Sequence, residues 1–232
     1  MNMTRQHLSN VSCKGVSAAG PGAFAVSDVR RHDRDDGSTI LQNGVPLPSP
    51  LPDVMDRFEH WAASSGDLIL VTEPCGAGRR TLSYGEAASL SQALAELLIE
   101  RGCQYGDVVC VIAGAGCDHA VVKLACLRVG LIHAPLSPSL AATASGLSKL
   151  EAMVGICQPA IILSENACLP ALQKFEAASS SGVISLSRLI GDAECATGNG
   201  SGLSDVRARI AIDDNAAIYF TSGSTGSAKG VL

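Results

Sequence analysis

From Asp53 onward, apolar residues recur alternately at helical spacing and in short continuous runs. Val54, Phe58 and Trp61 fall on one face of a helix that Asp53 can cap, and we expect that face to be buried. A second helix begins where Ser83 and Glu86 show the spacing of a capping box, and it ends near Gly102. The same reasoning predicts a helix capped by Asp118 and another near residues 169–177.

Short β-branched runs separate these helices. The run at 107–113 is almost wholly apolar, which is typical of a strand buried on both faces. Further strands are expected at 68–71, 81–83, 131–136, 159–164, 182–186 and 215–221, and a Gly-rich loop at 191–204. Because helices and strands alternate, the pattern predicts an α/β fold with a largely parallel sheet.

The first 50 residues show neither the helical nor the strand periodicity of apolar positions. They mix Gly, Ser and Pro with the charged run at 30–38, and a proline-rich stretch at 46–52 ends them. We therefore expect residues 1–50 to form a disordered or loosely attached leader and residues 51–232 to form the structured part.

Composition excludes several classes of protein. The 232 residues are 47% hydrophobic and carry a formal net charge of -5 without a basic stripe, so we expect no nucleic-acid partner. The longest clean apolar run spans about ten residues, whereas about 20 are needed to cross a bilayer, so no membrane span is expected. The start of the chain has no apolar stretch typical of a secretory signal, which favours a cytoplasmic location.

The nine cysteines contain no C-x-x-C pair and no zinc-site spacing. Several lie inside apolar runs, so we interpret them as reduced, buried side chains used as small hydrophobes. No metal-ligating residue is predicted.

The residues that carry chemistry close the chain, in the segment IYFTSGSTGSAKGVL at 218–232. Glycines there allow close approach of the backbone to a ligand, successive N–H groups can form an anion-binding concavity, and hydroxyls and one lysine add donors. This composition suits a polyphosphate. The neighbours of Lys229 are Ala228 and Gly230, so the segment is not a Walker A loop. A flexible Ser/Gly linker is the alternative, but a linker has no reason to follow a buried strand or to contain a single lysine.

TSGSTGSAKG resembles the phosphate-loop signature Y/F-T-S-G-S/T-T-G-x-P-K-G of the adenylate-forming superfamily, which includes acyl-CoA synthetases, peptide-synthetase adenylation domains and firefly-type luciferases. Ala228 stands where proline is usual, so we expect a looser loop. The segments at 81–87, 102–116 and 126–139 are also similar to family segments, so the resemblance spans about 51–232. The segments EHWA and HAPLSPS are similar to feruloyl-CoA synthetase-like members.

The resemblance implies the N-terminal, incomplete portion of the large multi-sheet domain of these enzymes. It implies ATP-dependent activation of a carboxylic acid, with Mg²⁺, as an acyl-adenylate, followed by thioester formation with CoA. By position, the phosphate-binding residues would be Thr221, Ser222, Gly223, Ser224, Thr225, Gly226 and Lys229. The catalytic residues are not assigned.

Two other interpretations stay open. The chain could be an adenylation module that loads a carrier-protein thiol, or a truncated product without catalysis. The family's adenine and acyl pockets and its C-terminal lysine lie downstream of this loop, so we expect the isolated chain to be inactive.

Two histidines lie outside this segment. His119 follows Cys117 and Asp118 at a helix start, which favours a surface or capping role over a nucleophile–base pair. His133 is expected to be a packed core or pocket-wall residue.

Overall fold

A computed structural model describes residues 28–45, 53–173, 175, 182–196, 203–222 and 228–232. They fall into two compact units, Met1–Leu51 and Pro52–Leu232. None of the helices within the described residues is long and apolar enough to cross a bilayer.

The first unit contains a hairpin where the sequence pattern indicated no strand. β1 (Val29–Asp33) pairs antiparallel with β2 (Thr39–Asn43). Asp33 ties the two strands together, because its carboxylate accepts hydrogen bonds from the Thr39 hydroxyl at 2.6 Å and from Arg31 Nε at 2.9 Å. These bonds lower the pKa of Asp33. Residues 28–45 thus form a hairpin inside the segment that we expect to be a disordered or loosely attached leader, and its strands carry mostly exposed side chains.

The second unit is built on a four-stranded sheet with the order β6-β5-β7-β8. All three strand pairs are parallel, which confirms the predicted fold class. The strands are β5 (Val108–Ile112), β6 (Ile132–Leu136), β7 (Ile161–Ser164) and β8 (Val183–Ser185). β5 and β7 lie in the middle of the sheet and are almost completely buried, as the apolar runs predicted.

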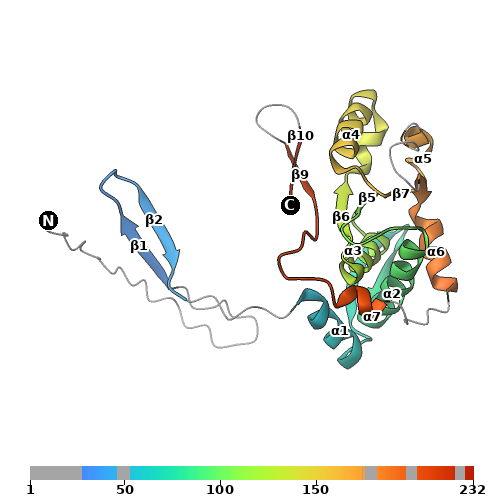
Figure 1. Cartoon of the computed structure of the whole chain (residues 1–232), viewed down its shortest axis with the longest axis horizontal. Helices are drawn as coiled ribbons and strands as arrows, with labels where there is room; N and C mark the ends of the chain where they lie inside the picture. The colour runs from blue at the N-terminus through green and yellow to red at the C-terminus, as the bar shows by residue number, and fades with distance from the viewer. Residues whose placement is uncertain (1–27, 46–52, 174, 176–181, 197–202, 223–227) are drawn as a thin grey trace. The chain divides into compact units, whose positions relative to one another are not determined.

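Helices cover both faces of this sheet, so the unit has three layers (Figure 1). One face packs against α2 (Tyr84–Glu100), α3 (Cys117–Val129) and α6 (Leu186–Cys195). The other face packs against α4 (Ala144–Cys157) and the short α5 (Leu169–Leu172). Successive residues of β5 and β7 point to opposite faces, so each strand contributes to two cores.

The start of this unit forms α1 (Val54–Ser64) and an antiparallel hairpin of β3 (Ile69–Cys75) and β4 (Gly78–Ser83). Asp53 caps α1 by accepting the Met55 N–H, and the Ser83–Glu86 capping box is present in full. Trp61 is 47% exposed, so the predicted burial of that residue is wrong. Met55 and Phe58 bury the inner face of α1 instead.

Several elements were not predicted, namely the 3₁₀ helix η1 (Pro138–Ala142), α4, α6 and α7 (Leu203–Arg207). α6 occupies 191–195, which the pattern indicated as loop, and α5 (Leu169–Leu172) lies within the helix expected near 169–177. The chain closes with an antiparallel hairpin of β9 (Tyr219–Ser222) and β10 (Ala228–Val231). The expected strand at 215–221 therefore starts later than predicted.

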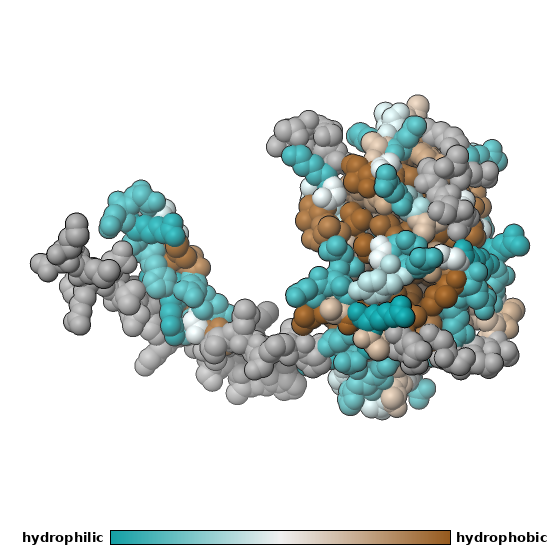
Figure 2. Space-filling model, in the orientation of Figure 1, coloured by the Kyte–Doolittle hydropathy of each residue, from teal (hydrophilic) through white to brown (hydrophobic). Residues whose placement is uncertain are grey.

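Most described cysteines are buried and all of them are free thiols, and only Cys75 and Cys195 among them are exposed. Burial raises the pKa of Cys103 to about 11. This agrees with their interpretation as small core residues. Figure 2 shows hydrophobic surface as well, and the exposed large apolar side chains of this unit include Val54, Trp61, Leu68, Ile69 and Ile212.

Candidate functional site

The β9–β10 hairpin brings together two of the predicted phosphate-binding residues. Thr221 lies directly opposite Lys229 in the antiparallel register. Opposed residues of an antiparallel pair project from the same face, about 5 Å apart at Cβ. Both residues are exposed, so a hydroxyl and a cation share one open surface.

Of the remaining predicted residues, only Ser222 lies within the described part of the chain. Ser222 is the last residue of β9, and its side chain lies outside the described atoms. Gly223, Ser224, Thr225 and Gly226 lie outside the described residues. The described part of the site therefore consists of the two strands, β9 and β10, on either side of residues 223–227.

The opposite face of the hairpin packs inward. Ile218 and Phe220 are partly buried against the core on the α4 side of the sheet. A Cβ added at Gly230 would lie 3.2 Å from Ile218 and 3.5 Å from Phe220. Glycine at this position therefore lets β10 approach its neighbours closely, and the packed face orients the exposed one.

The hairpin is joined to the edge of the central sheet through His133 in β6. The His133 N–H donates to the Ala216 carbonyl at 3.1 Å, and the Ile218 N–H donates to the His133 carbonyl at 3.0 Å. His133 thereby forms an isolated parallel bridge with Ala217. The segment 216–218, which bonds to the edge strand β6, thus leads directly into β9.

A second lysine reaches the exposed face of β9. Lys123 on α3 donates to the Tyr219 hydroxyl over 3.4 Å, and Tyr219 lies on the same face of β9 as Thr221. Sequence reasoning missed this residue, because it is separated from Tyr219 by 96 positions and belongs to an ordinary helix pattern. Only the tertiary packing of α3 reveals it.

The start of α3 is arranged differently from the prediction. The N-cap is Gly116 rather than Asp118. Glu73 from β3 accepts the Cys117 N–H at 2.9 Å, which places a carboxylate at the positive end of the helix. Asp118 instead forms a 2.7 Å ion pair with Arg80, whose pKa is raised further by this hydrogen bond.

His119 is also more than a surface residue. It is half-buried, and its Nε2 lies 3.0 Å from Nε2 of His133. His133 itself is only 2% exposed, which confirms the prediction of a packed histidine. The pair links α3 to β6, the strand that bonds to the segment leading into β9.

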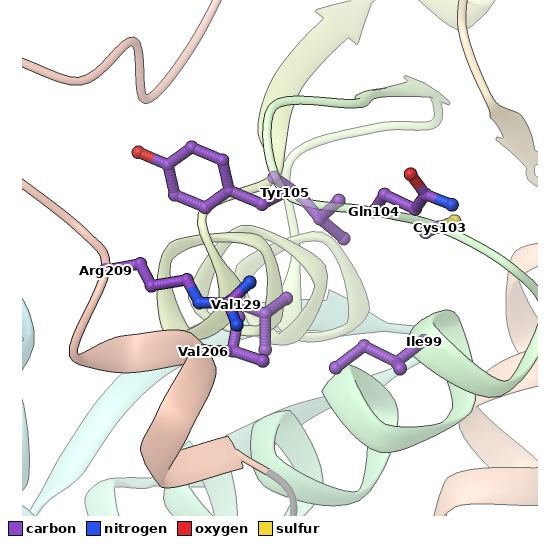
Figure 3. A pocket seen from close by; sticks show the side chains of 8 residues that line it. Ile99, Cys103, Gln104, Tyr105, Val129, Val206 and Arg209 are labelled. Carbon is purple, nitrogen blue, oxygen red and sulfur yellow. The ribbon is translucent and has the colours of Figure 1, made fainter.

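A cavity of about 340 Å³ lies elsewhere, between the ends of α2 and α3 and the α7 region. Its lining is mainly apolar, and Figure 3 shows the Arg209 side chain directed into it beneath Tyr105. None of the predicted site residues lines this cavity. The exposed face of β9 and β10 therefore remains the candidate site.

Comparison with known proteins shows the family. The model of the AMP-binding enzyme family matches residues 58–232, which is more than half of the chain. The hybrid PKS-NRPS synthetase gkaA of Penicillium citrinum is 26% identical over 211 residues, which is 90% of this chain and 5% of that protein.

Solved structures of two proteins are also similar to this chain. The structure of McyG A-PCP complexed with phenylalanyl-adenylate is 25% identical with a TM-score of 0.63, over 80% of this chain and 34% of that one. ATP-bound MatB from Rhodopseudomonas palustris is 26% identical with a TM-score of 0.53, over 76% of this chain and 34% of that one. The chain spans about a third of the length of these two structures and a twentieth of the synthetase. Because that family model covers most of the sequence, this chain belongs to the AMP-binding, adenylate-forming enzyme family.

Proposed function

We propose that this chain contributes the phosphate-binding part of an enzyme that activates a carboxylic acid with ATP. The observation that carries the proposal is the pairing of Thr221 with Lys229 on the exposed face of the hairpin that flanks TSGSTGSAKG. A lysine ammonium and a hydroxyl are suitable partners for phosphate oxygens. Mg²⁺ would arrive bound to the phosphates of ATP, as is usual for this ion.

The chemistry needs little covalent participation by the protein. A carboxylate is a poor electrophile, and attack of its oxygen on the α-phosphorus of ATP converts it into an acyl-adenylate with release of pyrophosphate. Lys229 would neutralise charge on the departing phosphates, and the hairpin would hold them in place. A thiol then attacks the acyl carbon, which forms a thioester and releases AMP.

Two acceptor thiols are supported about equally. CoA follows from the similarity of EHWA and HAPLSPS to feruloyl-CoA synthetase-like members, which would make the acid aromatic. A carrier-protein thiol is favoured by the hybrid PKS-NRPS synthetases among the relatives and by the McyG A-PCP structure. CoA and a carrier-protein thiol are therefore both candidate acceptors for the second half of the reaction.

ATP–pyrophosphate exchange tests the first half. The natural protein that contains this sequence would be assayed with a panel of aromatic, fatty and amino acids, and we expect exchange that depends on one class of acid. A Lys229→Met variant should lose most of the exchange, whereas Lys149→Met on the exposed side of α4 should not. Absence of exchange with every acid would contradict the proposal.

Transfer of the labelled acyl group distinguishes the acceptors. Incubation with CoA or with a pantetheinylated carrier protein should give one labelled thioester, detected by mass spectrometry. Labelled acyl-CoA supports the ligase, and labelled carrier supports the loading module.

A further inference from the structure

His119 and His133 form a side-chain pair beside the candidate site. Their Nε2 atoms are 3.0 Å apart, and the rings meet edge to face with centroids 5.0 Å apart. His133 belongs to β6 and is buried, and His119 belongs to the first turns of α3. The pair therefore connects α3 to β6 at the edge of the sheet.

The hydrogen bonds determine the tautomer of each ring. His119 Nδ1 lies 3.2 Å from the Gly114 carbonyl, which can only accept, so this nitrogen carries the proton. A neutral His119 then has a bare Nε2, which accepts from Nε2–H of His133. His133 Nδ1 is left as a buried acceptor without a hydrogen-bond partner among the described residues.

The backbone of His133 holds the strand that becomes β9. Its N–H and its carbonyl bond to Ala216 and Ile218, on either side of the bridge to Ala217. His119 and Lys123 are four residues apart on α3, so they share one helix face, and Lys123 bonds to Tyr219 of β9. One face of α3 thus contacts both β6 and β9.

We propose that the His119–His133 pair positions β9, and with it the Thr221–Lys229 pair, and that protonation of the pair releases this strand from β6. The importance of β9 for nucleotide binding rests on the function proposed above. His119 and His133 are positioning residues in this proposal, because neither needs to touch the substrate.

The surroundings of the pair disfavour a charge. A proton added to His119 Nε2 would face Nε2–H of His133, so the hydrogen bond would break unless His133 changed tautomer. Lys123 on α3 adds positive charge nearby, while Tyr219 of β9 is its neutral partner. Burial and these neighbours lower the pKa of His133 to about 3 and also lower the pKa of His119.

The sign of the effect follows from linkage. When β9 separates from β6 and the rings meet water, their pKa values return to about 6.5, so the open form binds protons more readily. Opening therefore becomes easier as the pH falls below about 6.5. For a single histidine with a closed-state pKa of about 3, the protection of the affected amides should fall roughly 25-fold between pH 7 and pH 5.

Imidazole nitrogen NMR tests the pair directly, since the chain has five histidines. At pH 7.5 we expect His119 as the Nδ1–H tautomer and His133 as the Nε2–H tautomer. Both rings should titrate below the ordinary range of a free imidazole. The opposite tautomers, or an ordinary pKa for both rings, would overturn the proposal.

Amide hydrogen exchange by NMR tests the coupling, with an internal control on the same strand. The amides of His133 and Ile218 bridge β6 and the strand before β9, whereas the amide of Ile132 bonds to Asp107 beside β5. We expect protection to fall with pH at the first two amides and to persist at Ile132. Equal pH dependence at all three amides would contradict the proposal.

Matched variants separate positioning from packing. His119→Phe keeps a ring but removes the acceptor, and it should reduce protection of Ile218 roughly tenfold at pH 7. His119→Gln restores a side-chain oxygen that can accept from His133, and it should recover most of that protection. If both variants behave alike, or if the control His60→Gln has the same effect, the pair has no positioning role.

Exchange kinetics provide a further readout. His119→Phe should raise the KM for ATP roughly five- to tenfold with a smaller change in kcat, and His119→Gln should reverse it. If the natural protein shows no exchange with any acid, the proposed function fails, while the NMR results still decide whether the pair positions β9. An unchanged KM in an active His119→Phe variant would contradict the positioning of the nucleotide site.

Discussion

The central strands and the final hairpin of the second unit are stabilised in different ways. β5 and β7 are buried on both faces, and their apolar residues contact helices above and below the sheet. The β9–β10 hairpin buries one face and exposes the other, and its link to the sheet depends on the backbone of His133 and on the side chains of α3. The first region is a packed core, and the second presents polar groups on an exposed face.

This contrast means that stability and binding should respond to different substitutions. Truncation in the middle of the sheet removes dispersion contacts and leaves a cavity. Replacement of an exposed polar residue on the hairpin should remove a contact with the proposed ligand and leave the packing intact. Substitutions in the two regions can therefore be compared directly.

The largest expected effect is in the sheet. Leu163 in β7 is completely buried, so Leu163→Ala should lower the free energy of unfolding by about 3 kcal/mol. Val231→Ala in β10 is the matched control, since Val231 is 51% exposed and should change the value by less than about 0.5 kcal/mol. Urea denaturation followed by circular dichroism measures both, and similar costs would remove the distinction between the two regions.

Lys229→Met should weaken binding and leave stability nearly unchanged, which is the reverse of the effect of Leu163→Ala. The loss of a charge-assisted hydrogen bond should weaken ATP binding by about 2 kcal/mol, or roughly 30-fold, while the melting temperature stays nearly constant. Calorimetric titration of the natural protein with ATP measures the affinity, with Lys149→Met as the control. A large fall in melting temperature would instead assign Lys229 to the structure of the hairpin.

The region between sheet and hairpin should respond to pH. His133 has a pKa of about 3 in the folded chain against about 6.5 when unfolded, so the unfolded state binds more protons at intermediate pH. This contribution to stability is present above pH 6.5 and is lost as the pH falls, by about 2 kcal/mol between pH 7 and pH 5.

His133→Phe isolates that contribution from the titration of carboxylates. The free energy of unfolding of the variant should depend less steeply on pH over the same range, by about the stated amount. Urea titrations at pH 7, 6 and 5 give both curves, and parallel curves would show that His133 does not titrate differently on folding.

The smallest effect is expected at the edge of the unit. Ser83 caps α2 in a complete capping box, so Ser83→Ala should destabilise the chain by about 1 kcal/mol. Ser89 lies inside the same helix and is exposed, and Ser89→Ala should be neutral or slightly stabilising, because alanine favours helix interiors. Thermal unfolding of the two variants makes the comparison, and equal shifts would mean that the cap contributes nothing.

Much of the buried architecture could be predicted from the sequence. The apolar run at 107–113 and the Ser83–Glu86 spacing each depend on interactions that are local or nearly so, and both predictions are confirmed. α6 was missed although Leu186, Leu189, Ile190 and Ala193 are buried at helical spacing. The hairpin at 28–45 gave no such signal, because its strands carry mostly exposed polar residues.

The candidate site also combines features encoded locally in the sequence with features that depend on tertiary packing. The sequence by itself determined the fold class and the family, because strand burial and glycine-rich turns are encoded in neighbouring residues. It also predicts the residues of the phosphate-binding segment. Only the tertiary structure decided that Lys123 reaches Tyr219, that Glu73 rather than Asp118 accepts a backbone N–H at the start of α3, and that His119 meets His133. Those contacts join residues far apart in the chain, and their geometry exists only once α3 has packed against the sheet.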